Sequence, residues 1–209
     1  MFLPLLQVKT KHWICAVVFV GWLAASLYGA AWLWDFNLRP GKTQPSLPQW
    51  PTSSQLTPPE GKPMLVIFLH SECPCSRASL EELSALLAKS RDKVDVQAVF
   101  LRPAETGDAV EESGLWKYVH MLPGVKAWKD GTDQEATLFH ASTSGETFLY
   151  DRAGNLKFRG GITPSRGHIG DNLGVDSIVS IVNGGKETHS IQTPVFGCSL
   201  KHSQPPTQL

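Results

Sequence analysis

The longest apolar stretch of the chain lies near its N-terminus. No charged residue occurs from Ile14 to Trp34, and a helix rising about 1.5 Å per residue would span about 30 Å over this stretch, which matches the hydrocarbon core of a bilayer. Trp13, Trp32 and Trp34 stand at its two ends, where amphipathic rings favour the headgroup region. We therefore predict one transmembrane helix over residues 13–34.

The short head before this helix, residues 1–12, is basic. A basic head before a first helix usually stays in the cytoplasm, so the rest of the chain would lie on the far side of the membrane. A cleaved signal peptide is the alternative, with Ala24-Ala25-Ser26 as its small-residue cleavage site. The apolar run continues well past that site, which favours an uncleaved anchor. Both interpretations place the remaining chain outside the cytoplasm.

Residues 35–60 show neither helical nor strand periodicity. Prolines recur along them, and most other positions are Gly, Ser, Thr or Gln. Proline breaks helices and discourages strands, so we expect an extended segment that buries no core. We interpret it as a tether that holds a globular domain away from the bilayer.

The first half of the domain, which we place over residues 61–185, has a strand, a helix and a second strand. The continuous apolar run Met64–Leu69 is typical of a strand buried on both faces. From Ser76 to about Lys89, leucines recur at helical spacing and define one apolar face. Val94–Leu101 alternates and then becomes continuously apolar, which predicts a second strand.

Further elements follow in the order helix, short insertion, hairpin. Residues 111–121 are expected to be helical, 125–128 to form a short strand and 133–139 a short helix. Thr147–Tyr150 and Leu156–Arg159 form a hairpin, because the residues between them include the Gly and Asn that tight turns require.

A last helix completes the domain. Asp171 or Asn172 can cap its start, and Asn183-Gly184-Gly185 ends it. The tail, residues 186–209, has no periodicity and is predicted to lie outside the domain.

This order, a βαβ unit followed by a ββα unit, resembles the thioredoxin-like fold over residues 60–185. The most specific feature is an apolar strand, then Cys73-Pro74-Cys75, then an amphipathic helix. The anchor, the run Cys-Pro-Cys-Ser-Arg-Ala-Ser-Leu-Glu-Glu-Leu and the later segments Gly-Gly-Ile-Thr, Arg-Gly-His-Ile-Gly-Asp-Asn and Thr-Pro-Val-Phe-Gly-Cys also resemble the membrane-anchored bacterial proteins named RedB. The resemblance implies a single-pass protein of the bacterial inner membrane, with its domain on the periplasmic side.

Composition and charge argue against nucleic acid as a partner. Nineteen Lys and Arg residues balance nineteen Asp and Glu residues, so the formal net charge is zero. Phosphate binding needs a basic stripe, and the sequence has none. The apolar fraction of 42% is ordinary for a protein with a packed core.

Cys73 and Cys75 stand where the predicted strand meets the predicted helix. Unpaired N–H groups at a helix N-terminus stabilise an anion, so the pKa of a cysteine there should fall below its free value of about 8.5. The thiolate is the species that attacks disulfides. The resemblance implies that Cys73, in an exposed loop, attacks and that Cys75 resolves the mixed disulfide. We therefore predict a thiol–disulfide oxidoreductase that acts on protein thiols or disulfides and needs no cofactor.

Two features depart from the thioredoxin pattern. Thioredoxins have two residues between their cysteines, whereas this chain has only Pro74. The smaller disulfide ring should be strained and easily reduced, which favours an oxidant or isomerase over a strong reductant. The family also carries a cis proline before the third core strand, where this chain has Ser144-Gly145-Glu146-Thr147.

Three auxiliary residues are candidates for the site. His70 precedes the cysteine pair and is a proton-transfer partner, a metal ligand or a strand-end histidine that faces water. His168 lies in a loop that returns, in this fold, to the cysteine end of the sheet. Cys198 can reach the pair if the tail folds back, because an extended chain covers about 3.3 Å per residue, or it is a lone thiol. His140 is expected at the surface and Cys15 as a packing residue.

Other functions stay open. Two thiolates with His168 or Cys198 would suit Cu(I), and Sco-type copper proteins share the fold and the anchor but have three residues between their cysteines. A membrane-tethered binding module without catalysis is the non-enzymatic alternative. Peroxide reduction is less favoured, because peroxiredoxins have Thr or Ser at the position of His70. A purely structural Cys73–Cys75 disulfide would close almost no loop and would stabilise the fold little.

Overall fold

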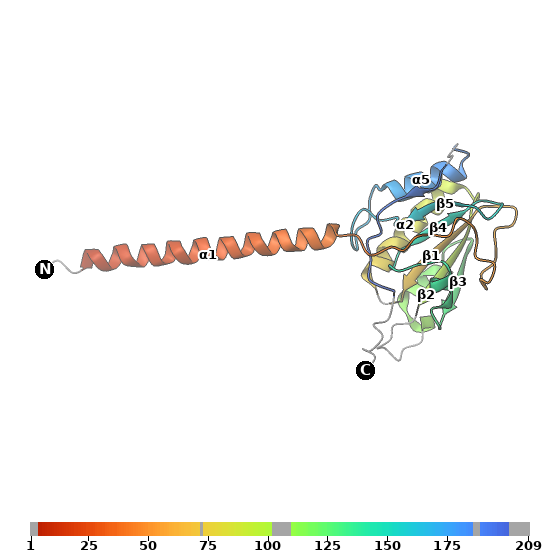
Figure 1. Cartoon of the computed structure of the whole chain (residues 1–209). Helices are drawn as coiled ribbons and strands as arrows, with labels where there is room; N and C mark the ends of the chain where they lie inside the picture. Colours follow the sequence, from red (N-terminus) through yellow and green to blue (C-terminus); the bar gives the residue numbers. More distant parts are fainter. Residues whose placement is uncertain (1–3, 72, 102–109, 186–188, 201–209) are drawn as a thin grey trace. The chain divides into compact units, whose positions relative to one another are not determined.

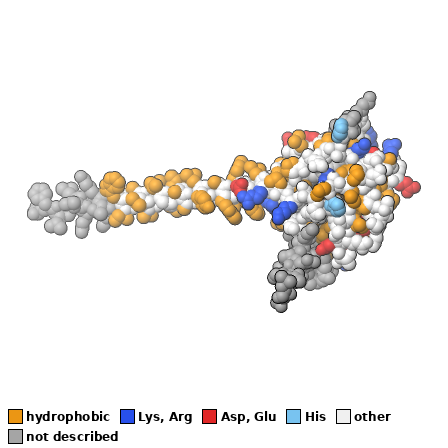
Figure 2. Space-filling view, viewed as in Figure 1, with side chains coloured by type: hydrophobic (Ala, Val, Ile, Leu, Met, Phe, Trp, Pro, Cys, Tyr) orange, Lys and Arg blue, Asp and Glu red, His pale blue; other side chains and the backbone are white. Residues whose placement is uncertain are grey.

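A long helix forms the N-terminal unit of the chain. The computed structural model describes residues 4–71, 73–101, 110–185 and 189–200, and it divides into two units, Met1–Arg39 and Pro40–Leu209 (Figure 1). Helix α1 runs over Pro4–Leu38, and its stretch His12–Leu38 is long and apolar enough to cross a membrane once, with a mean hydropathy of 2.0. Hydrophobic side chains line α1 in Figure 2. The candidate span thus contains the predicted residues 13–34 and continues to Leu38.

The second unit is built on one six-stranded sheet with the order β3-β2-β1-β4-β5-β6. Strands β1 (Met64–His70), β2 (Asp95–Leu101) and β3 (Val125–Asp130) are parallel neighbours. The hairpin of β4 (Thr147–Tyr150) and β5 (Leu156–Gly160) lies antiparallel to β1. This is the βαβ plus ββα arrangement of the thioredoxin-like fold, as predicted.

Helices cover the face of the sheet to which Leu65, Ile67 and Leu69 of β1 point. Three helices pack there: α2 (Pro74–Ser90), α3 (Gly114–His120) and α5 (Leu173–Val182). Four leucines were predicted for the apolar face of α2. Leu80, Leu83 and Leu86 are buried in this core, and Leu87 is partly buried against it. A single turn of 3₁₀ helix, Val110–Glu112, precedes α3. Asn172 caps α5 by accepting a hydrogen bond from the N–H of Val175, which settles the choice between the two predicted caps.

The opposite face, to which Met64, Val66 and Phe68 point, is covered differently. The short helix α4 (Gln134–Leu138) and Phe139 contribute to it, together with segments that come from the two ends of the unit. Leu56 before β1 and Leu200 near the C-terminus are each 2% exposed in this second core. Strand β1 is therefore buried on both faces, as its continuous apolar sequence predicted.

The predicted tether is wrong for residues 40–60, because this segment packs on the domain. The ring of Trp50 contacts the rings of Phe139 and Tyr150, and its backbone N–H donates a hydrogen bond to the carbonyl of Gly154. The N–H of Gly41 donates to the carbonyl of Val195 at 2.7 Å. The segment lacks regular structure, as its prolines require, but its backbone groups find partners on the domain instead of water.

The predicted exclusion of the tail from the domain is also wrong. Ile191–Gln192 forms strand β6, which pairs in parallel with β5, and Val195 is 1% exposed. Only two residues pair in β6, so the strand gave no periodic signal in the sequence. Residues 191–200 run from the sheet edge beside β5 to the loop that contains Thr143, near the cysteines.

Candidate active site

Cys73 sits at the junction that the sequence predicted, between the end of β1 and the start of α2. It is the N-cap residue of α2, in extended conformation, and Pro74 follows in the first turn. The N–H of Cys73 donates to the carbonyl of His70 at 3.2 Å, which turns the chain sharply from strand to helix. Proline suits the first helical position because its fixed φ fits and its missing N–H is not needed there.

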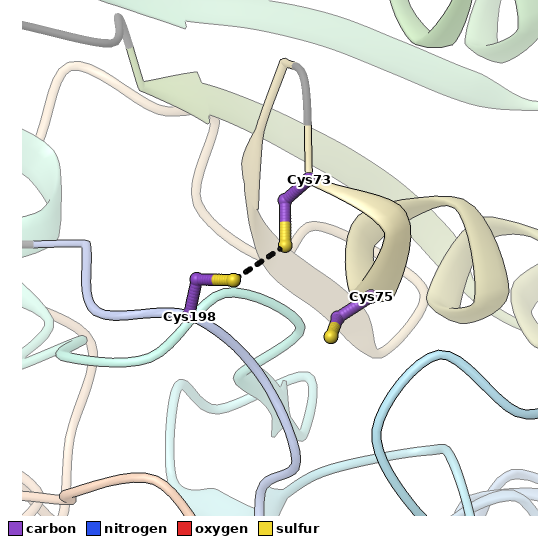
Figure 3. Close-up of side chains that lie close together, drawn as sticks. All are labelled: Cys73, Cys75 and Cys198. Carbon is purple, nitrogen blue, oxygen red and sulfur yellow. Dashed lines mark hydrogen bonds between the residues drawn. The ribbon is translucent and has the colours of Figure 1, made fainter.

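Three sulfur atoms meet at this junction. The Sγ atoms of Cys73, Cys75 and Cys198 all lie within 4.8 Å of one another. A hydrogen bond joins the Sγ atoms of Cys73 and Cys198 at 3.0 Å, drawn as a dashed line in Figure 3. The structure thus brings together the predicted pair and the distant cysteine of the tail.

Backbone pairing holds the tail at this position. The N–H of Ser144 donates to the carbonyl of Cys198 at 2.8 Å, and the N–H of Leu200 donates to the carbonyl of Ser142 at 2.9 Å. Thr143 and Ser199 form an antiparallel bridge between these two bonds. The tail therefore lies as an added extended strand along residues 142–144, with Cys198 directed at Cys73.

The electrostatics place one thiolate on Cys73. Hydrogen bonds from the Cys198 and Cys75 thiols lower the pKa of Cys73 well below its ordinary value, and the N–H groups of Ser76 and Cys75 add to this. The pKa of Cys75 is raised by its hydrogen bonds with Cys198 and Cys73 and by burial. The hydrogen bond with Cys73 also raises the pKa of Cys198, against the opposing effects of its hydrogen bond with Cys75 and of the charge of Arg166. These opposite shifts favour ionisation of Cys73 over that of Cys75 and Cys198.

The exposure expected for Cys73 is wrong. Cys73 is 4% exposed and Cys75 8%, whereas Cys198 is exposed. Cys73 is covered because the tail brings Cys198 against it, a contact between residues 125 positions apart that the local pattern around β1 does not determine. Of the three cysteines, Cys198 is therefore the most exposed residue.

The stretch Ser144-Gly145-Glu146 leads into β4, where the resemblance to thioredoxins had led us to look for a cis proline. Among the described residues no peptide bond is cis. The Ser144 hydroxyl shares a hydrogen bond of 2.7 Å with that of Ser76 in the first turn of α2, and Gly145 donates its N–H to the carbonyl of Phe68. Gly145 has φ +85°, a conformation that favours glycine. A serine pair and a glycine turn therefore join this loop to the cysteine helix.

A buried ion pair fixes the same loop from behind. Glu146 is fully buried, and its Oε1 accepts hydrogen bonds from Nε and Nη2 of Arg159 at 2.9 and 2.6 Å. Its Oε2 accepts from the N–H groups of Ser142 and Thr143 at 2.8 and 3.3 Å. Arg159 also donates to the carbonyl of Gln44 in the packed N-terminal segment. Sequence reasoning missed this pair, because Glu146 looked like an ordinary turn residue.

The predicted histidines are not part of the sulfur cluster. His70 is half-buried at the end of β1, and its backbone N–H donates a hydrogen bond to the Ser76 hydroxyl oxygen at 3.0 Å. His168 is exposed, and its Nδ1 lies 2.6 Å from the carbonyl oxygen of Arg166. His140 is half-buried rather than fully at the surface, with Nδ1 2.6 Å from the carbonyl oxygen of Pro45.

The loop after the hairpin does return to the cysteine end, but Arg166 makes the contact. Its Nη1 donates to the carbonyl of Gly197, next to Cys198. The motif Arg-Gly-His had drawn attention to the imidazole instead. Cys15 is exposed on α1, where the sequence had suggested a packing residue.

Comparisons with known proteins bear on the fold. No protein-family model and no curated protein matches the chain. Among solved structures, a hypothetical protein from Sinorhizobium meliloti 1021 is 20% identical with a TM-score of 0.61, over 78% of this chain and all of its own. An uncharacterized conserved protein from Geobacillus kaustophilus is 21% identical with a TM-score of 0.58, over 82% of this chain and 95% of its own. A thioredoxin-like protein in the oxidized form is 18% identical with a TM-score of 0.47, over 72% and 97% of the two chains.

Proposed function

We propose that the chain is a membrane-tethered thiol–disulfide oxidoreductase of the RedB type, with its domain on the periplasmic side of a bacterial inner membrane. One observation carries this proposal: the buried Cys73 stands at the N-terminus of α2 with the sulfurs of Cys75 and Cys198 within 4.8 Å, and its surroundings lower its pKa. A low-pKa thiolate beside other thiols is the arrangement that exchanges disulfides. Protein thiols or disulfides are the substrates that suit it.

Exchange proceeds in two balanced steps. The Cys73 thiolate attacks one sulfur of a partner's disulfide, forms a mixed disulfide and releases the partner's first thiolate. A second thiol of this chain, beside Cys73, then loses its proton and attacks the Cys73 sulfur, which releases the second thiolate of the partner. The partner gains two electrons, and two protein thiols become one disulfide. The reverse sequence oxidises a partner dithiol.

A redox titration tests the proposal. We would equilibrate the full chain in mild detergent, with Cys15→Ser as the parent, against a series of reduced and oxidised glutathione ratios. Free thiols are counted by alkylation and intact mass. We expect two thiols to disappear in a single two-electron step, in which a tenfold change in equilibrium corresponds to about 30 mV. Cys73→Ser should abolish the step. Thiols that stay free at every ratio, or a step that survives Cys73→Ser, would refute the proposal and favour the non-catalytic binding module.

Copper handling is the second candidate, favoured by the composition of the cluster. Three thiols within 4.8 Å form a soft donor set of the kind that selects Cu(I). Cys73, Cys75 and Cys198 would hold the ion, and the last two would release protons on binding because their pKa values are raised. His168 is not in the cluster of described residues, so the predicted ligand set is narrowed to the sulfurs.

Competition with a chromophoric Cu(I) chelator distinguishes the two candidates. A copper protein would withdraw one Cu(I) per chain from the chelator, and Cys73→Ser would remove this uptake. An oxidoreductase would show the glutathione step without withdrawing copper at a comparable chelator concentration.

A further inference from the structure

We propose that Cys198, and not Cys75, resolves mixed disulfides formed on Cys73, so that Cys73–Cys198 is the working disulfide of this protein. This inference rests on the proposed function, and it revises the division of roles that the sequence suggested. It assigns a catalytic role to a cysteine 125 residues away from its partner in the chain.

The first argument is the approach of the two sulfurs. Cys198 Sγ lies 3.0 Å from Cys73 Sγ, about 1 Å more than the disulfide bond length of about 2.0 Å. The two sulfurs point toward each other in Figure 3, one from the start of α2 and one from the tail. A small movement of an exposed segment would bring them to bonding distance.

The second argument is that the fold is shaped to hold the tail here. The backbone bonds of Cys198 and Leu200 to residues 142–144 fix the tail on both sides of the bridge. Gly197 packs so closely on this loop that a Cβ would stand 1.9 Å from the carbonyl oxygen of Ser144. Arg166 binds the carbonyl of Gly197 from the other side. These contacts together hold Cys198 beside Cys73.

The third argument concerns Cys75. It lies in the first turn of α2, separated from Cys73 only by Pro74, whose ring fixes the backbone between the two sulfurs. A disulfide across one residue closes a small strained ring, whereas a bond to Cys198 closes a long loop without that constraint. Cys75 is suited to donate a hydrogen bond to the Cys73 thiolate and so to keep it ionised.

The resolving step balances as follows. A partner is joined to Cys73 through a mixed disulfide. The Cys198 thiol loses its proton to water, and its sulfur attacks Cys73 Sγ. The bond between Cys73 and the partner breaks, the partner leaves as a thiolate and takes up a proton, and the Cys73–Cys198 disulfide remains. Because Cys198 covers Cys73 in this structure, the tail must move aside for the partner and then return.

A trapping experiment tests the assignment. The full chain in mild detergent, with Cys15→Ser as the parent, is reduced and then mixed with an unstructured one-cysteine peptide supplied as its symmetric disulfide. Intact mass and peptide mapping follow the peptide adduct on Cys73. We expect Cys198→Ser to hold this adduct at least about tenfold longer than the parent, because it loses a thiol already oriented for attack. Cys75→Ser should clear the adduct nearly as fast as the parent and should yield a mapped Cys73–Cys198 disulfide.

Other outcomes overturn different parts of the argument. If Cys75→Ser holds the adduct and Cys198→Ser clears it, Cys75 is the resolving cysteine and the inference fails, while the proposed function stands. Equal trapping by both variants also overturns it. If no variant forms an adduct, and the parent forms no disulfide, the proposed function itself fails.

A second variant keeps the Cys198 thiol and changes only its position. Gly197→Ala should displace the tail from Ser144, so that the adduct persists about as it does in Cys198→Ser although the thiol is intact. Gly131→Ala is the matched control, because a Cβ at Gly131 meets no atom within 4 Å. Rapid clearing by Gly197→Ala, at the rate of the Gly131→Ala control, would show that docking of the tail is irrelevant and would refute the inference.

Discussion

The buried carboxylate of Glu146 offers a quantitative test of how the site loop is held. Each of its oxygens is occupied: Oε1 accepts from Arg159, and Oε2 accepts from the N–H groups of Ser142 and Thr143. In Glu146→Gln one oxygen becomes an NH₂ group. Whichever way the amide turns, two hydrogen-bond donors then face each other, and Arg159 loses its counter-charge in a buried site.

The expected cost follows from this geometry. Breaking a buried ion pair by removing one charge typically destabilises a protein by about 3–5 kcal/mol. For a domain of this size, about 1 kcal/mol shifts the melting temperature by about 2–4 °C, so we expect a fall of roughly 6–20 °C. Near-ultraviolet circular dichroism of the reduced full chain in mild detergent follows the loss of tertiary structure in the domain.

Glu111→Gln is the matched control for this measurement. Glu111 also pairs with a cation, Lys129 at 2.6 Å, but their side chains are 45% and 43% exposed. Exposed pairs contribute only about 0–1 kcal/mol, so this variant should melt within a few degrees of the wild type. If Glu146→Gln melts as the control does, the loop is not held by the ion pair and the argument is refuted.

Three further predictions concern the boundaries, the thiolate and the topology. A fragment of residues 40–209, which lacks α1, should fold. A fragment of residues 56–209 should be destabilised by at least about 3 kcal/mol or should aggregate, because it lacks Trp50 and the backbone hydrogen bonds of that residue. Equal melting temperatures of the two fragments would contradict this prediction. The ultraviolet absorbance of the Cys73 thiolate should persist well below pH 8, because the pKa of Cys73 is lowered, and Cys198→Ser should move the pH midpoint of this absorbance upward. The contribution of the Cys73 thiolate to stability is fully present above the unfolded pKa of about 8.5 and is lost as the pH falls through the lowered folded value. In intact spheroplasts, an impermeant thiol reagent should label Cys198 after mild reduction, because Cys198 is exposed. Labelling only after lysis would place the domain in the cytoplasm.

Local sequence patterns predicted the parts of the fold that depend on local periodicity. The apolar run of β1, the leucine spacing of α2 and the hairpin of β4 and β5 all correspond to elements in the structure. These patterns arise because each element buries its own apolar face against the sheet. The position of Cys73 at the strand–helix junction followed from the same signals.

The segments outside these elements could not be predicted, because their partners are distant in the sequence. Trp50 is held by Phe139, by Tyr150 of β4 and by Gly154 in the hairpin turn. Val195 is held by Gly41, and no periodicity marks such irregular packing. The same holds for the site. The length of the tail is enough for Cys198 to approach the pair. Its position, however, depends on hydrogen bonds to the backbone of residues 142–144, which no pattern of side chains in the sequence predicts.

The pairing of the two ends of the domain has a consequence for how the protein is made. Gly41 bonds to Val195, and Thr143 pairs with Ser199, so contacts between residues far apart in sequence close the structure. Contacts of this kind raise the contact order and slow folding. Synthesis proceeds from the N-terminus, so the final packing has to wait for residues close to the C-terminus. A nascent chain therefore exposes Cys73 and Cys75 before Cys198 is available, and this interval is when either thiol is most open to reaction with other proteins.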